Sequence, residues 1–243
     1  MIKNKTIVIT GSEGLIGKDI TKYFKKKNYE IIGIDVVGGK NTIKCDITNE
    51  KVLKKKLEKK LKKIQPDILI NAASKIPKIN KFKFSSYNSQ KWIKGLEVDL
   101  LGSFYVTKIC CKYFEKVNSG MIINLSSIYG VSGPDQSIYG KAEKYHGYKS
   151  LEYSVAKAGV IGFTKALSSY YKDTNIKVLC LILGGVFEKK LKKNFIKRYL
   201  SKTIENKMLS TKEICNYIEF CINNKNTISG SSIAIDSGAN AMF

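Results

Sequence analysis

Tyr153 and Lys157 lie four residues apart in this 243-residue chain, within a stretch of helical periodicity. Residues at this spacing share one face of a helix, so the two side chains are expected to lie together. A phenol with its ordinary pKa of about 10 is a poor acid–base catalyst at neutral pH, and a neighbouring ammonium lowers that pKa by favouring the phenolate. With the hydroxyl of Ser127 as a hydrogen-bond donor, the pair predicts proton exchange with a carbonyl or alcohol oxygen.

A glycine-rich stretch near the start of the chain predicts a dinucleotide site. The apolar run at 7–9 reads as a buried strand, three glycines follow at a spacing of three, and a helical pattern comes next. Bare backbone in such a turn lets a pyrophosphate approach, and the N-terminus of the helix attracts its charge. The loop residues expected to contact the cofactor are Gly11, Ser12, Glu13, Gly14, Leu15, Ile16 and Gly17.

An acidic residue ends the second predicted strand, residues 30–34. Asp35 stands 18 residues after Gly17 (35 − 17), close to the ~20 expected for the acid that binds an adenosine ribose. A carboxylate here accepts hydrogen bonds from both ribose hydroxyls and repels a 2′-phosphate. Glu13 adds a second negative charge in the glycine loop, so NAD is expected rather than NADP.

The charge of the chain is strongly positive, with 43 basic residues against 20 acidic and a net charge of +23. Lysine, isoleucine and asparagine are abundant throughout and arginine occurs once, whereas nucleic-acid readers rely on arginine. We therefore attribute the charge to composition and expect neither a nucleic-acid nor a membrane partner. No apolar run approaches the ~20 residues of a membrane span. The six cysteines show no metal-binding spacing, and the first strand follows within a few residues, so we expect a cytoplasmic protein without a metal site.

Apolar strands alternate with helical patterns along the whole chain. Strands are predicted at 7–9, 30–34, 67–73, 121–125, 178–183 and 232–235, with a short segment at 41–47, and helices at 50–65, 92–114, 153–171 and 211–223. This alternation predicts an α/β fold: a single domain, 1–243, with a Rossmann-like, doubly wound parallel sheet and helices on both faces. Ligands of such a sheet bind at the carboxyl ends of the strands, where the glycine loop, Asp35, Asn71 and Ser127 all fall.

Taken in order, these motifs resemble the short-chain dehydrogenase/reductase family along nearly the whole chain. TGSEGLIG at 10–17 is similar to its glycine motif, NLSSIYG at 124–130 to the strand that carries its serine, and SGSSIAIDSG at 229–238 to its last strand. The resemblance implies that Tyr153 exchanges the proton, that Ser127 orients the substrate oxygen and that Lys157 holds the nicotinamide ribose. The further cofactor contacts that it implies are Asp46, Ile47, Asn71, Ala72, Ala73, Tyr153, Lys157 and Val186.

Two departures from the family pattern concern the active site. Asp99 stands where the family has a helical asparagine that relays protons, and an ionised aspartate can accept but not donate. Ser127 and Tyr153 lie 26 residues apart (153 − 127), which predicts an insertion at 133–149 bordering the site. This insertion holds His146, the only histidine, which is either a solvated loop residue or a substrate contact or proton relay.

Residues 186–208 correspond to the family's substrate lid, and 186–207 contain eight basic residues and two acidic ones. This charge either attracts an anionic substrate or reflects the lysine bias. We therefore predict an NAD-dependent oxidoreductase acting on a hydroxyl or carbonyl of a small polar compound, including phosphorylated or nucleotide-linked sugars. The chain also resembles bacterial members linked to surface-polysaccharide or flagellin sugar biosynthesis.

Two other readings of the function remain open from the sequence. One is a 3-oxoacyl-carrier-protein reductase, whose acidic carrier would suit a basic lid but whose usual NADP preference does not suit Asp35. The other is a non-catalytic NAD-binding regulatory or scaffold protein. The family resemblance also implies a homodimer or homotetramer built on the helices at 92–114 and 153–171 and on the last strand.

Overall fold

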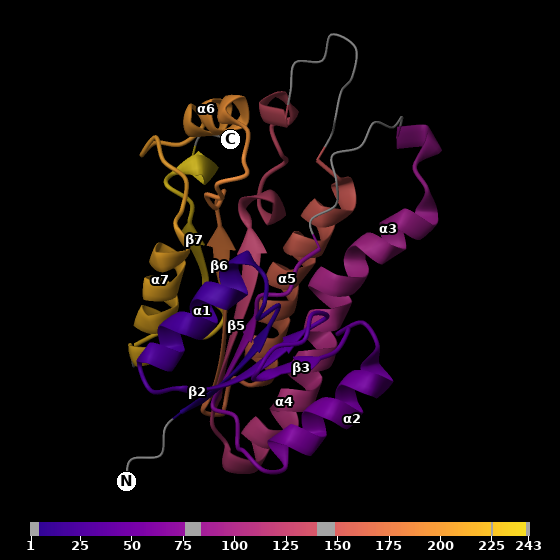
Figure 1. The fold of residues 1–243 in the computed structure, drawn as a ribbon, viewed down its shortest axis with the longest axis vertical. Helices are drawn as coiled ribbons and strands as arrows, with labels where there is room; N and C mark the ends of the chain where they lie inside the picture. The colour runs from indigo at the N-terminus through magenta and orange to yellow at the C-terminus, as the bar shows by residue number, and fades with distance from the viewer. Residues whose placement is uncertain (1–4, 76–83, 140–148, 225, 242–243) are drawn as a thin grey trace.

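A computed structural model describes residues 5–75, 84–139, 149–224 and 226–241 of the chain (Figure 1). They form one sheet of seven strands in the order β3-β2-β1-β4-β5-β6-β7, and every neighbouring pair is parallel. The strands are β1 (Thr6–Thr10), β2 (Glu30–Asp35), β3 (Thr42–Lys44), β4 (Ile68–Asn71), β5 (Gly120–Ser127), β6 (Ile176–Leu183) and β7 (Ser232–Ile235). The predicted doubly wound parallel sheet is confirmed.

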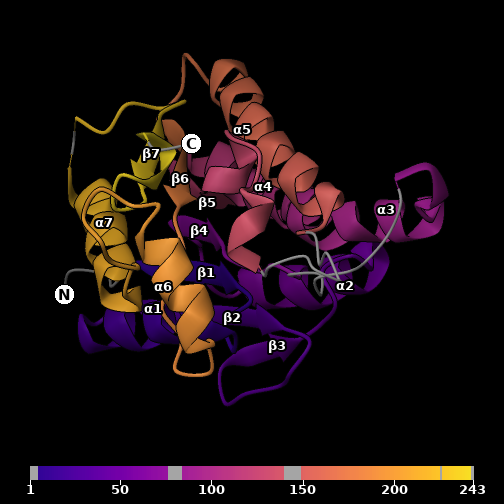
Figure 2. The same ribbon diagram turned by 90° about the horizontal axis from the view of Figure 1, so that it is seen from above.

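The strands are continuous apolar runs because helices cover both faces of the sheet. On one face lie α1 (Leu15–Lys26) and α7 (Thr211–Asn223), whose apolar side chains form one core with alternate strand residues. On the other face lie α2 (Glu50–Leu61), α4 (Ser103–Val117) and α5 (Leu151–Tyr170). Figure 2 shows these two helical layers on either side of the strands.

The helical segment predicted at 92–114 is longer and less regular than expected. It consists of α3 (Ser89–Leu96), a π-helical segment (Glu97–Gly102) and α4 in direct succession. A π-helical turn shifts the side chains that follow it to a new angle around the helix, and such turns are frequent at functional sites. The shift falls on Asp99, which is almost completely buried.

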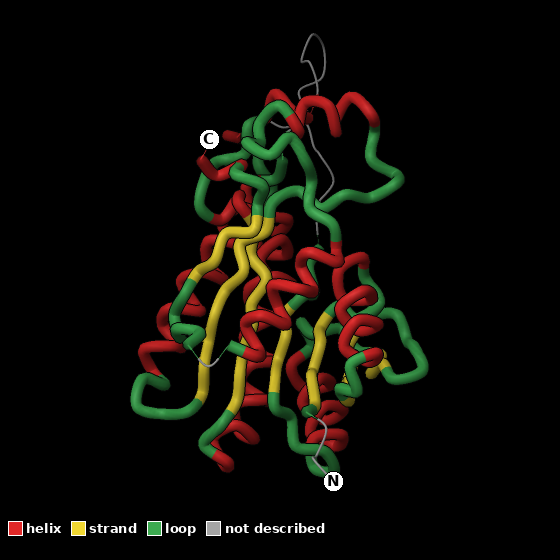
Figure 3. Tube along the Cα trace, turned by 90° about the vertical axis from the view of Figure 1, so that its left-hand side faces the viewer, coloured by secondary structure: helices red, strands yellow, loops and turns green. Residues whose placement is uncertain are grey.

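The carboxyl ends of all seven strands point to the same end of the molecule, where turns and the short helix α6 (Lys193–Leu200) gather (Figures 1 and 3). At this end, neighbouring central strands have these residues side by side: Thr10 of β1 pairs with Asn71 of β4, and Asn71 pairs with Asn124 of β5. The residues predicted to carry the chemistry are therefore brought to one edge.

Some sequence expectations fall on parts of the chain that are not described. Of the predicted insertion at 133–149, the structure describes Gly133–Tyr139 and Lys149, and His146 lies outside the described residues. In the predicted lid, only α6 is helical. Within the described ranges, no helix has the length and apolar character needed to cross a bilayer.

Candidate active site

The glycine loop joins β1 to α1 and is packed so tightly that side chains are excluded. Gly11 has a φ of +66°, and a Cβ there would lie 2.7 Å from the Cα of Ala73. A Cβ on Gly17 would lie 2.1 Å from the carbonyl oxygen of Gly11. Helix α1 begins at Leu15 and Ile16 with no side chain capping its first turn, so its N–H groups face the loop without a side-chain acceptor. This bare cradle fits a dinucleotide pyrophosphate.

Two carboxylates meet beside this cradle. Asp35, the last residue of β2, accepts hydrogen bonds from the backbone N–H of Glu13 (3.0 Å) and of Val37 (3.0 Å). The Glu13 carboxylate in turn accepts from the Thr42 hydroxyl at 2.5 Å. Asp35 and Glu13 therefore come together from separate segments, as the sequence predicted, and place two negative charges next to the loop.

Asp46 and Ile47 follow β3, farther along the same edge. The Asp46 carboxylate is exposed and accepts from the backbone N–H and the hydroxyl of Thr48 at 2.9 and 2.8 Å. Ile47 is buried, and a Cβ on Gly102 would lie 2.6 Å from its Cδ1. Ile47 thus packs on the π-helical segment, whereas Asp46 keeps its carboxylate at the surface.

A buried polar network supports the ends of the central strands. The Thr10 hydroxyl accepts from the backbone N–H groups of Ala72 and Ala73, both at 3.0 Å. The side-chain amide of Asn71 donates to Thr107 at 3.0 Å and to Asn124 at 2.8 Å. The side-chain oxygen of Asn71, Oδ1, is buried and has no hydrogen-bond partner within the described part of the chain. The network fixes the turn after β4, which forms the floor under the glycine loop.

Ser127, Tyr153 and Lys157 converge where β5 ends and α5 begins. Ser127 is the last residue of β5, and Tyr153 and Lys157 lie on adjacent turns of α5. The Ser126 hydroxyl donates to the Lys157 carbonyl oxygen at 2.8 Å, which joins the strand to the helix. All three predicted side chains are at most 9% exposed.

Lys157 pairs with Asp99, an arrangement that the sequence did not predict. The Lys157 ammonium lies 2.7 Å from Asp99 Oδ1 and donates to the Leu125 carbonyl oxygen at 3.1 Å. The same Oδ1 accepts from the Ser74 hydroxyl at 2.6 Å, and Oδ2 accepts from the backbone N–H of Lys75 at 3.1 Å. Asp99, expected at the position of a relaying asparagine, is instead the counter-ion of Lys157.

This ion pair sets the protonation of the site. Burial opposes the charge on Lys157, but the charges of Asp99 and Tyr153 outweigh it and raise the pKa of the ammonium. Burial raises the pKa of Tyr153, the Lys157 ammonium and a hydrogen bond with Ser127 lower it in part, and the Asp99 charge raises it again. The expected lowering by Lys157 is present, but burial outweighs it and the phenol stays protonated at neutral pH.

A second lysine at the centre was missed by the sequence analysis. Lys149 lies two residues before the start of α5 at Leu151 and is 8% exposed. Its ammonium lies 4.2 Å from the centroid of the Tyr153 ring and 6.0 Å from that of Tyr129. Burial, opposed by the charge of Asp99 and reinforced by that of Lys157, lowers the pKa of Lys149 to about 8. In so lysine-rich a chain, nothing in the pattern could have marked this residue.

Aromatic side chains form the wall beside these groups. The Tyr139 hydroxyl donates to the Tyr129 hydroxyl at 2.7 Å. The Phe195 ring of α6 lies 5.6 Å from Tyr139 and 6.1 Å from Tyr199, measured between ring centroids. The Tyr199 hydroxyl accepts from the backbone N–H of Gly185. The wall therefore connects α6 to the turn after Ser127.

The predicted lid starts at a short parallel bridge between Val186 and Leu209. Three of its lysines, Lys190, Lys202 and Lys207, form ion pairs at 2.8 to 3.0 Å, and Arg198 donates to the Ile138 carbonyl oxygen at 2.8 Å. The other four basic residues have no ion pair within the described residues: Lys189, Lys192, Lys193 and Lys197. Four of the eight basic residues of this segment therefore already have partners within the protein.

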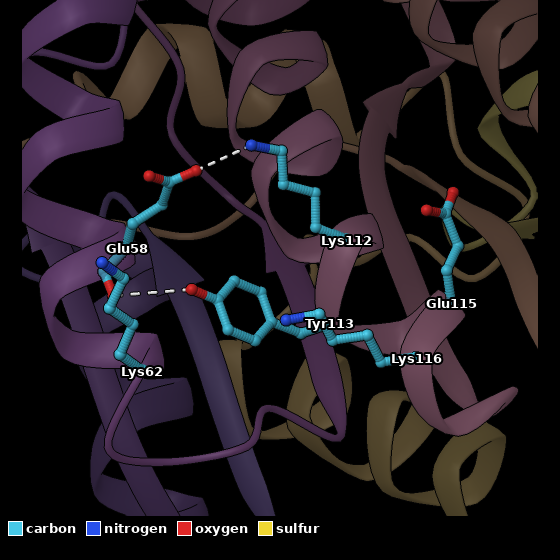
Figure 4. Close-up of a pocket in the computed structure, with 6 residues that line it drawn as sticks. All are labelled: Glu58, Lys62, Lys112, Tyr113, Glu115 and Lys116. Atoms are coloured by element: carbon cyan, nitrogen blue, oxygen red, sulfur yellow. Dashed lines mark hydrogen bonds and ion pairs between the residues drawn. The ribbon is translucent and has the colours of Figure 1, made fainter.

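A hollow also lies between α2 and α4, away from the catalytic side chains (Figure 4). It is bordered by Glu58, Lys62, Lys112, Tyr113, Glu115 and Lys116. Glu58 and Lys112 form a partly exposed ion pair across it at 2.8 Å. Such pairs are common on lysine-rich surfaces, and we assign the hollow no chemistry. Over the described ranges, acidic, cysteine and histidine side chains form no group that could hold a metal ion.

Comparison with known proteins is consistent with this geometry. Residues 5–198 match the family model described as short chain dehydrogenase. Post-translational flagellin modification protein A of Campylobacter coli is 29% identical, over 98% of this chain and 99% of that protein. The 3-oxoacyl-[acyl-carrier-protein] reductase FabG of Buchnera aphidicola is 28% identical, over 98% of each.

Solved structures give the same fold. A short chain dehydrogenase from Leptospira borgpetersenii with bound NAD⁺ superimposes with a TM-score of 0.87 at 27% identity, covering 98% of this chain and 93% of that one. ElxO with NADP bound gives a TM-score of 0.85 at 24% identity, covering 98% and 100%. From the family match over most of its length, this chain belongs to the short-chain dehydrogenase family of NAD(P)-dependent dehydrogenases and reductases.

Proposed function

We propose that this protein is an NAD-dependent oxidoreductase that transfers a hydride between nicotinamide and a hydroxyl or carbonyl of a small polar substrate. The observation that carries the proposal is the convergence of Ser127, Tyr153 and Lys157 at the strand ends, beside the glycine cradle. When bound, the nicotinamide supplies or accepts the hydride. Glycine-loop backbone, Asp35 and Lys157 would hold the cofactor.

The protein groups then handle the proton. The Tyr153 hydroxyl donates its proton to the substrate oxygen as the carbonyl carbon gains the hydride, and Ser127 orients that oxygen. The raised pKa of Tyr153 keeps the phenol protonated at neutral pH, which supports the reductive direction. Tyr153→Phe keeps the ring but removes the proton donor, so we expect turnover to fall by roughly 10²–10⁴-fold while NADH still binds.

NAD is the proposed cofactor because two carboxylates, Asp35 and Glu13, lie beside the glycine loop and would repel a 2′-phosphate. Titration of the protein with NADH and NADPH, followed by cofactor fluorescence, should show tighter NADH binding. Asp35→Ser should reduce or reverse the preference for NADH over NADPH. Glu30→Ser, which removes one charge at the far end of β2, is the matched control and should leave it unchanged. Equal or tighter NADPH binding by the wild type would refute the NAD assignment.

For the substrate, we propose a small polar hydroxy or oxo compound of the sugar type, including phosphorylated or nucleotide-linked sugars. Similarity to a flagellin modification protein and the four unpaired lysines of residues 186–208, the proposed substrate lid, support this class. A screen of such compounds with NAD⁺ and NADH, monitored at the nicotinamide absorbance, tests it. Activity must disappear in Tyr153→Phe to count as turnover by this site.

A second candidate is a ketoreductase that acts on acyl-carrier-protein thioesters. Several FabG proteins are among the relatives, and the unpaired lysines would suit an acidic carrier. This candidate predicts that the protein reduces acetoacetyl thioesters with NADPH. The first candidate predicts little activity on these thioesters and little activity with NADPH. A protein that binds NADH but turns over none of these compounds would favour a non-catalytic NAD-binding role.

We further propose that the protein is a homodimer or homotetramer. Apolar side chains of the π-helical segment, α4 and α5 face outward, with Leu101, Phe104 and Val155 40 to 45% exposed. The Phe104 ring lies 6.0 Å from that of Phe163, so this apolar surface spans both helices. Light scattering should give a multiple of the 27.3 kDa chain mass, and Phe104→Glu should reduce it.

A further inference from the structure

Lys149 is held beside the catalytic tyrosine by its own backbone. Its backbone N–H donates to the side-chain oxygen of Gln136 at 2.8 Å, which joins the segment before α5 to the turn at Gln136–Tyr139. The side chain is 92% buried, and its ammonium lies over the Tyr153 ring. The cation is therefore next to the group that exchanges the proton with the substrate.

Within the described ranges, the Lys149 ammonium has no anionic partner. Among the described residues, no carboxylate lies within ion-pair distance of it and no side chain or carbonyl accepts its hydrogens. Two described acids near the start of α5 are buried: the Glu152 carboxylate accepts from the Tyr87 hydroxyl, and the two oxygens of Asp99 are occupied by Lys157, Ser74 and the backbone of Lys75. Aromatic faces compensate a buried cation only in part, so an anionic ligand would stabilise this charge.

A second hydrogen-bond donor lies beside this cation. The Tyr129 hydroxyl accepts from Tyr139, so it keeps its own proton for another acceptor, and no acceptor for that proton is found in the described part of the chain. The Tyr129 ring is within 6.0 Å of the Lys149 ammonium. One cation and one phenol hydroxyl match the single charge and the two oxygens of a carboxylate.

We propose that Lys149 binds a carboxylate of the substrate, so that the substrate is a hydroxy or oxo acid whose carboxylate lies close to the reacting carbon. The inference rests on the proposed function, because the reacting oxygen is the one that Tyr153 serves. Lys149 and Lys157 against Asp99 leave one positive charge in the described centre, which a monoanion neutralises. A phosphate dianion would require a second free cation, and Lys157 is engaged by Asp99.

Matched pairs of small probes test this proposal without the natural substrate. Glycolate and 3-hydroxypropanoate carry a hydroxyl near a carboxylate, and their amides have the same shape without the charge. Binding to the protein–NAD⁺ complex is measured by calorimetry. We expect the acids to bind at least tenfold more tightly than the amides, and Lys149→Met to remove that difference. Lys59→Met, at an exposed lysine of α2 outside the site, is the matched control and should keep it.

The pH dependence of binding gives a second readout. Affinity for the acids should fall as pH rises from 7 to 9, because the pKa of Lys149 is about 8 and only the ammonium binds an anion. Lys149→Arg keeps its charge across this range, so its affinity should not fall. A wild-type protein that binds acids and amides alike, or that binds neither, would overturn the proposal.

Other outcomes separate this proposal from the proposed function. Tighter binding of inorganic phosphate than of either acid, lost in Lys149→Met, would replace the carboxylate by a phosphate. Turnover of neutral hydroxy compounds that is unaffected by Lys149→Met would leave the oxidoreductase function intact and overturn the role of Lys149. Binding of acids through Lys149 with no hydride transfer to any carbonyl compound would instead overturn the oxidoreductase function.

Discussion

Lys157 and Lys149 each bring a buried ammonium to Tyr153, but the regions that surround them differ. Lys157 lies between the Asp99 carboxylate at 2.7 Å and the Leu125 carbonyl oxygen at 3.1 Å. Lys149 lies against the aromatic faces of Tyr153 and Tyr129, without a described counter-ion. The pKa of Lys157 is raised, whereas that of Lys149 is lowered to about 8.

The comparison shows that one carboxylate decides the role of each lysine. With Asp99 beside it, Lys157 is a fixed cation whose position is set from three segments of the chain. Without an acid, Lys149 is a cation that can respond to a ligand and to pH. The first environment suits the positioning of a cofactor and a phenol, and the second suits recognition of an anion.

The largest effect is expected from removing the paired cation. Lys157→Met leaves Asp99 buried without its counter-ion, which should lower the free energy of unfolding by about 3–5 kcal/mol. Turnover should fall by roughly 10²–10⁴-fold. Urea unfolding and steady-state rates measure the two effects. Adding Asp99→Asn should restore stability but not turnover, and a stable, active Lys157→Met would contradict the pairing.

Removing the other cation should have the opposite effect on stability. The pKa of Lys149 is lowered from 10.5 to about 8 in the folded state. Protonation of Lys149 therefore lowers the stability of the folded state relative to the unfolded state, and the loss has its full size below pH 8. Lys149→Met should therefore raise the free energy of unfolding at pH 7 by about 3 kcal/mol. The gain should disappear as pH rises towards 10.5. Urea unfolding at both pH values measures it, and a loss of stability at pH 7 would show that the charge is compensated.

A smaller effect is expected from neutralising the shared acid. Asp99→Asn removes a charge that raises the pKa of Tyr153, so the limb where activity falls as the phenol loses its proton should move to lower pH. Stability should also drop, but by no more than in Lys157→Met, because Lys157 loses its counter-ion while the amide oxygen can still accept a hydrogen bond from its ammonium. A pH–rate profile is the measurement, and Asp173→Asn, at an exposed acid with no part in the site, is the control for charge alone.

The smallest effect joins the two regions. The Asp99 charge raises the pKa of Lys149 from a distance, so Asp99→Asn should lower the midpoint of pH-dependent acid binding by less than about one pH unit. Calorimetry with glycolate across pH measures this shift. An unchanged midpoint would mean that the charge of Asp99 does not affect the pKa of Lys149.

The sequence by itself determined the features that depend on local spacing. A glycine turn, an acid at the end of the next strand and a tyrosine four residues before a lysine each have one local geometry, so the sequence can predict Gly11, Asp35, Tyr153 and Lys157 as site residues. Alternating strand and helix patterns determined the sheet for the same reason, since periodicity reports which face of an element is buried.

Tertiary structure alone decided which charges meet. Asp99 and Lys157 come from helices 58 positions apart in sequence (157 − 99), and only the π-helical turn directs the carboxylate inward. Lys149 is identical in type to dozens of exposed lysines and is distinguished by burial, which depends on the packing of Tyr129 and Tyr153 around it. Electrostatic environment is a property of three-dimensional neighbours, so the sequence supplied the catalytic groups and the fold determined their charge states.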